Sequence, residues 1–117
     1  MMEFTERKVL IIVNSRPYGE IITFEGWRAA VGMFGMDHEP LLLFMGDGVF
    51  SLLKSADVMP FRMFKSTYLD FDGRILASRK SLEERNISAE EIFEEVEVAD
   101  ESMIAEALTE NEIILTF

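Results

Sequence analysis

Three short polar segments hold the residues of this sequence that are best suited to binding or catalysis. Each is expected to follow a buried strand, and ligands of open α/β sheets bind at the carboxyl ends of the strands. Basic side chains there could hold a small anion or a charged loop of a partner, although the same residue types are common in ordinary turns. The candidate residues are Arg16, Pro17, Tyr18 and Gly19 in the first segment, Asp47 and Gly48 in the second, and Ser78, Arg79 and Lys80 in the third.

Most other catalytic and cofactor-binding arrangements are missing from the sequence. There is no cysteine and only one histidine, His38, which excludes a thiol nucleophile and a zinc-type cluster. His38 lies in a polar turn and is expected to be solvated. No G-x-S-x-G motif, P-loop or dinucleotide fingerprint occurs. No EF-hand spacing occurs either, although an oxygen-ligated cation among the C-terminal acids stays open. We expect no metal, no cofactor and no enzymatic activity.

The pattern of apolar residues predicts the elements that would position these segments. The unbroken, mostly β-branched run 9–13 is typical of a strand buried on both faces, as in parallel sheets. Apolar residues then recur every three or four positions over 21–36, which predicts a helix. Residues 37–40 are expected to form a polar break and 46–48 a turn. Residues 55–73 have no firm assignment, although aromatic residues recur there at helical intervals.

The rest of the chain continues this alternation of strands and helices. Strands are expected over 41–45, 74–78, 94–98 and 112–117, with a short helical segment over 49–54 and a helix over 100–109. Two S-x-x-E capping boxes, at 81–84 and 88–91, predict helix starts. The predicted fold class is therefore α/β, a three-layer α/β/α sandwich around a five-stranded, mostly parallel sheet. We expect one domain over residues 1–117.

The net charge of −11 is unevenly distributed along the chain. Residues 1–82 hold ten acidic and ten basic side chains, whereas residues 83–117 hold twelve acidic side chains and only Arg85. An acidic surface of this kind repels phosphate backbones, which disfavours direct nucleic-acid binding. It serves either as a solvated surface or as a docking face for a basic partner. No apolar run is long enough to span a membrane, and the N-terminus does not resemble a signal peptide, so a cytoplasmic location is expected.

Five short motifs, in order and at matching separations, resemble those of one protein family. They are Pro17-Tyr18-Gly19, Glu25-Gly26, the segment 43–53 with Asp47-Gly48-Val49 at its centre, the segment 81–87 and the closing segment 111–117. On these motifs the chain resembles the DsrE/DsrF family of sulfur-relay proteins, and within it the DsrF/TusC branch. The resemblance covers almost the whole length.

The resemblance implies a five-stranded parallel sheet and assembly with related DsrE/DsrF-type subunits, for example into hexamers. In such assemblies another subunit type carries persulfide sulfur on a cysteine just after the third strand, for tRNA 2-thiouridine formation or for sulfur oxidation. Here the residue nearest that position is Ser78, and a hydroxyl cannot form a persulfide. The implied role is a non-catalytic scaffold subunit of a cytoplasmic sulfur-relay complex.

A second interpretation depends only on the strand-end segments. The chain could be a stand-alone, homo-oligomeric protein that binds a small anionic ligand there, with Arg16, Arg79 and Lys80 as the cations. In the relay interpretation, Arg79 and Lys80 could instead lower the pKa of a neighbouring subunit's thiol or bind an anionic sulfur species.

Overall fold

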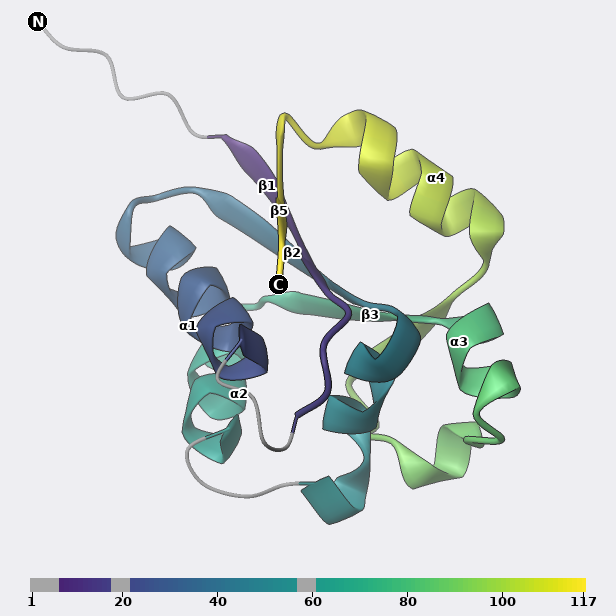
Figure 1. Cartoon of the computed structure of the whole chain (residues 1–117). Coiled ribbons are helices and arrows are strands. Elements are labelled where there is room, and N and C mark those ends of the chain that lie inside the picture. The colour runs from purple at the N-terminus through teal and green to yellow at the C-terminus, as the bar shows by residue number, and fades with distance from the viewer. Residues whose placement is uncertain (1–6, 18–21, 57–60) are drawn as a thin grey trace, which may run out of the picture.

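A five-stranded sheet forms the centre of the computed structural model, which describes residues 7–17, 22–56 and 61–117 (Figure 1). The spatial order of the strands is β4-β3-β2-β1-β5, and every neighbouring pair is parallel. The predicted α/β class and five-stranded parallel sheet are confirmed. The strands are β1 (Lys8–Val13), β2 (Glu39–Phe44), β3 (Arg74–Ser78), β4 (Val96–Ala99) and β5 (Ile113–Thr116).

Helices cover both faces of the sheet, which confirms the three-layer arrangement. Helices α1 and α2 lie together on one face, and α4 lies on the other (Figure 1). The α-helices are α1 (Ile22–Gly35), α2 (Phe61–Asp70), α3 (Arg79–Glu84) and α4 (Glu101–Glu110), and the 3-10 helices are η1 (Gly46–Leu52), η2 (Lys54–Ala56) and η3 (Ala89–Glu91). Within the described ranges, no helix combines the length and the hydropathy that a membrane crossing requires.

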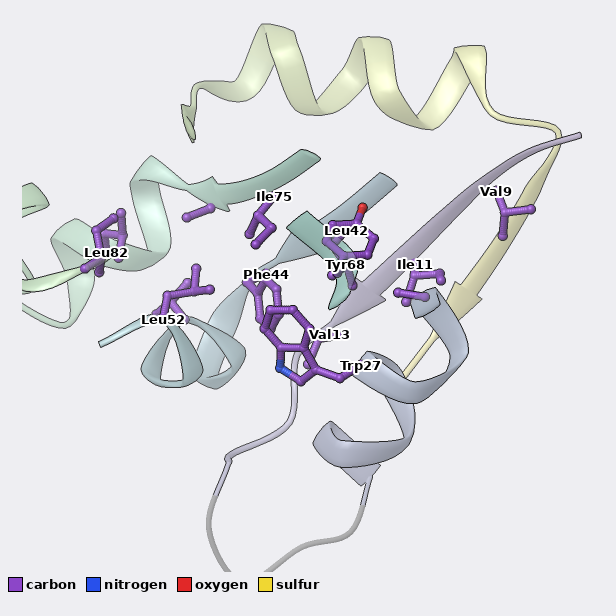
Figure 2. Packing of buried hydrophobic residues seen from close by; sticks show 14 residues of the cluster. Val9, Ile11, Val13, Trp27, Leu42, Phe44, Leu52, Tyr68, Ile75 and Leu82 are labelled. Atoms are coloured by element: carbon purple, nitrogen blue, oxygen red, sulfur yellow. The ribbon is translucent and has the colours of Figure 1, made fainter. Parts of the chain in front are cut away.

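The alternation of side chains along β1 explains its unbroken apolar run. Val9, Ile11 and Val13 face α1 and α2, while Leu10 belongs to the smaller cluster under α4. Trp27 of α1 fills the centre of the larger cluster, as Figure 2 shows. Because both sheet faces are covered, each position of the run gains from being apolar.

Several boundaries differ from the expected ones. The predicted polar break at 37–40 is wrong at its end, because β2 begins at Glu39 and includes Pro40. The Glu39 N–H donates to Arg7 O at 2.9 Å on the β1 side, so the proline nitrogen faces β3. Strand β3 begins only opposite Leu41, so the missing donor costs no ladder hydrogen bond.

Further along the chain, the expected turn at 46–48 is the first turn of η1, and the unassigned 55–73 region contains α2. The fourth strand starts two residues later than predicted, because Glu94 and Glu95 form a turn closed by Val96 N–H donating to Phe93 O at 3.2 Å. The second capping box is confirmed at Ser88, although it starts only the three-residue η3.

His38 is half-buried rather than fully solvated, and its Nδ1 accepts a hydrogen bond from the Arg7 N–H at 3.2 Å.

Candidate functional site

The carboxylate of Asp47 joins two of the three predicted segments. Asp47 follows β2 at the start of η1, and its Oδ2 accepts a hydrogen bond from Arg16 Nε at 3.0 Å. Its Oδ1 accepts from Arg85 Nε at 3.1 Å, with Arg85 Nη2 at 3.0 Å. The first segment, the second segment and the end of α3 therefore meet at one carboxylate.

The cluster holds two guanidinium groups and one carboxylate, so it carries one net positive charge. Hydrogen bonds from Arg16 and then from Arg85 hold the pKa of Asp47 below its usual value, which keeps the carboxylate ionised. Arg85 also donates from Nη1 to Ser81 O at 3.1 Å. The cluster therefore fixes the strand-end segments to one another and leaves one positive charge in excess at Arg16, whose side chain is 72% exposed.

Arg85 was not among the predicted site residues. Two signals in the sequence could have identified it, because it is the only basic residue in the acidic region 83–117 and it lies within the motif 81–87. Its partner Asp47 is 38 positions away, so the contact itself could not be seen in the sequence.

Gly48 allows the Asp47 segment to sit directly on the end of β1. A Cβ at position 48 would lie 2.1 Å from Val13 O and 2.7 Å from Val13 C. Beside it, Met45 N–H donates to the same Val13 O at 3.0 Å. Only glycine fits this approach, which gives the Asp-Gly-Val motif a steric reason.

Ser78 ends β3 and caps α3. Its Oγ accepts a hydrogen bond from the Ser81 N–H at 3.2 Å, and the residue is 3% exposed. The prediction that Ser81 caps a helix is wrong, because Ser81 lies inside α3 and its Oγ accepts from the Gly46 N–H at 2.9 Å instead. Ser78 is therefore enclosed, and its hydroxyl is used structurally.

The third segment is not part of the Asp47 cluster. Arg79 and Lys80 are exposed and line a separate hollow of about 220 Å³ between the ends of β3 and β4. Three acidic side chains line the same hollow, namely Glu83, Asp100 and Glu101. With two cations and three acids, the lining does not favour an anion.

The first segment is only partly described. Pro17 is buried, while Tyr18 and Gly19 lie outside the described residues. The buried hydroxyl of Thr23 at the start of α1 lies 2.8 Å from Arg16 O and 3.0 Å from Ser15 O, which ties this segment to the helix. Across the described part of the chain, no three histidine, aspartate or glutamate side chains gather as metal ligands would.

Comparison with known proteins gives consistent results. The model of the DsrE/DsrF-like family matches residues 7–117. The intracellular sulfur oxidation protein DsrF of Allochromatium vinosum is 27% identical over an aligned length of 131 residues, gaps included. The alignment covers 95% of this chain and 96% of that protein.

Two solved structures share the fold. The ychN protein from E. coli has a TM-score of 0.83 at 20% identity, with 95% of this chain and 99% of that chain covered. A protein of unknown function from Methanobacterium thermoautotrophicum has a TM-score of 0.73 at 14% identity, with 97% and 100% covered.

Proposed function

The chain belongs to the DsrE/DsrF-like family, and from that premise we propose that it is a non-catalytic scaffold subunit of a cytoplasmic sulfur-relay complex. It acts as one domain over residues 1–117. The observation that carries the proposal is the residue at the end of β3. Ser78 is buried and caps α3 with its hydroxyl, and the sequence contains no cysteine that could take over the carrier role. Persulfide transfer needs a polarisable thiolate, so the sulfur must be carried by other chains.

The partners in this proposal are related DsrE/DsrF-type subunits that keep the cysteine. The name of the Allochromatium vinosum relative favours a place in sulfur oxidation, and tRNA 2-thiouridine formation is the other candidate pathway. The acidic region 83–117 argues against direct contact with a nucleic acid. The Asp47 cluster serves this role by fixing the strand-end segments relative to one another.

Co-expression tests this proposal. The chain is produced with the cysteine-bearing relatives encoded in the same genome, purified through a tag on one subunit and measured by native mass spectrometry. A stoichiometric complex that contains both kinds of chain is expected. A chain that stays monomeric, or associates only with itself, contradicts the proposal.

The alternative function is a homo-oligomeric protein that binds a small anion at the strand-end segments. Its support is the exposed pair Arg79 and Lys80 beside a hollow, and the three acids in that lining weaken it. Thermal shifts with inorganic phosphate and thiosulfate, compared between the wild type and Arg79→Ala, distinguish the two functions. A saturable stabilisation that Arg79→Ala abolishes supports the alternative.

A further inference from the structure

A second hollow lies at the edge of the sheet where the strands begin, opposite the edge that holds the Asp47 cluster. Its volume is about 320 Å³. It is lined by the first residues of β1, β2 and β3, by the turn after α2 and by the end of α4. We call it the edge groove. Its lining includes Lys8, Phe34, Glu39, Phe71, Asp72 and Glu110.

An exposed aromatic ring forms one wall of the edge groove. Phe34 stacks on one face of the Phe71 ring, with the centroids 5.1 Å apart and the planes at 20°. Phe71 is nevertheless 59% exposed, so the other face of its ring is accessible. The N–H groups of Phe71, Asp72 and Gly73 fix this turn by donating to carbonyls of α2 at 3.3, 2.9 and 3.0 Å. An aromatic face held in this way favours a planar cation, because a guanidinium group stacks on it.

The charged residues of the edge groove leave an excess of negative charge. Arg74 also lines the groove, but its Nε and Nη2 donate to the two carboxylate oxygens of Glu97, each at 2.9 Å, so its charge is balanced. The other charged residues of the lining are three acids and Lys8. The acids, all exposed, are Glu39, Asp72 and Glu110.

The helix ends beside the groove strengthen the preference for a cation. Because each helix runs back between parallel strands, α1, α2 and α4 all end at the edge where the strands begin. None of these three helices has a basic residue in its last turn. The C-terminal end of a helix dipole is negative and is stabilised by a nearby cation. A cation supplied by another molecule would take that place.

We infer that the edge groove binds an arginine side chain of another protein. The guanidinium group stacks on the accessible face of Phe71 and pairs with a carboxylate of the lining. A second copy bound through the same groove about a twofold axis is a poor occupant, because the two sets of carboxylates would face each other. The inference goes beyond the proposed function and does not depend on it, since the groove lies at the edge opposite Ser78 and involves no sulfur chemistry.

The probe for the test is a phage-displayed library of random heptapeptides, selected on the purified wild-type chain. Peptides that contain arginine are expected to be enriched. The most enriched peptide is then synthesised with a fluorophore, and its Kd is measured by fluorescence anisotropy. Replacing its arginine with lysine should raise Kd about threefold or more, because an ammonium group lacks the planar face that stacks on an aromatic ring.

Matched variants locate the binding site. Phe71→Ala and Glu110→Lys should each raise Kd about fivefold, because the first removes the stacking face and the second opposes the arginine with a like charge. The control for the first is Met63→Ala, which changes a 58% exposed residue of α2. The control for the second is Glu84→Lys, because Glu84 is the last residue of α3 as Glu110 is of α4. Both controls should leave Kd within about twofold.

Thermal unfolding shows whether each variant is folded. If Phe71→Ala destabilises the chain, Asp72→Asn replaces it, because asparagine tolerates the positive φ of 62° at this position while the carboxylate is lost.

Each outcome decides the inference without touching the sulfur-relay proposal, which co-expression tests. If no arginine-containing peptide is enriched, or if the groove variants leave Kd unchanged, the inference is wrong. If Glu84→Lys weakens binding as much as Glu110→Lys does, the peptide responds only to overall charge, and the inference is also wrong. If native mass spectrometry shows that the groove variants abolish self-association of the wild type, the occupant is a second copy and the inference is overturned.

Discussion

Replacing Gly48 with alanine tests the close contact between the segment that holds Asp47 and the end of β1. The new Cβ would lie 2.1 Å from Val13 O, about 0.9 Å inside the 3.0 Å below which such contacts are essentially never found. Val13 cannot retreat easily, because β1 lies between β2 and β5 and is paired with both. Overpacking against fixed backbone costs about 3 kcal/mol or more in free energy of unfolding, which lowers Tm by about 12 °C for a chain of this size.

Gly32 supplies the matched control for this substitution. It lies in α1, and a Cβ there would meet nothing within 4 Å. Gly32→Ala should therefore raise the free energy of unfolding by about 0.5–1 kcal/mol, because alanine is the better helix former. Urea and thermal unfolding followed by circular dichroism measure both variants. A Gly48→Ala protein within about 1 kcal/mol of the wild type would refute the steric account of this motif.

Three further substitutions test other parts of the structure. Tyr68→Phe should cost about 1 kcal/mol in urea unfolding, because the buried hydroxyl donates to Arg74 O at 2.7 Å and phenylalanine cannot make this hydrogen bond. Ser78→Ala should cost about 1 kcal/mol as the loss of a helix cap, and an unchanged stability would argue against that capping role. Asp47→Asn should lower stability at neutral pH. Because the pKa of Asp47 is depressed in the folded state, its contribution is present above the usual aspartate pKa and is lost as pH falls through the lowered value. The difference from the wild type should therefore shrink as the pH falls below the usual aspartate value of 3.8 in pH-dependent unfolding.

The strands were predictable where a single local pattern determines them. The run 9–13 is apolar because both sheet faces are covered, and β3 was placed at 74–78, as the structure has it. Pro40 misled the prediction, because its tolerance depends on where the neighbouring strand begins. That information is tertiary and does not appear in the local pattern.

The candidate site was predictable in part. The expectation that strand-end segments converge holds for Arg16 and Asp47, which the structure brings together, whereas Arg79 and Lys80 line a different hollow. The helix cap was misplaced because Ser81, unlike Ser78, is followed three residues later by the glutamate of a capping box. The Gly46 N–H donates to the Ser81 Oγ, so the Ser81 hydroxyl is used in that contact. Ser78 caps the helix instead. Local sequence cannot resolve a competition that a distant backbone group decides.

The uneven charge of the sequence can also be located in the structure. The acidic region noted in the sequence includes η3, β4, α4 and β5. A solvated surface and a docking face predict different results when salt is varied in binding experiments, since only a docking face makes association weaken as ionic strength rises.

The central claim is that this chain takes part in sulfur relay without carrying sulfur itself. The most direct measurement is intact-mass analysis of the reconstituted complex after incubation with a cysteine desulfurase and cysteine. We predict that this chain is present in the complex at its unmodified mass, while sulfur adducts appear on the cysteine-bearing subunits. A complex that loads sulfur and assembles fully without this chain, or a sulfur adduct on this chain, would contradict the claim.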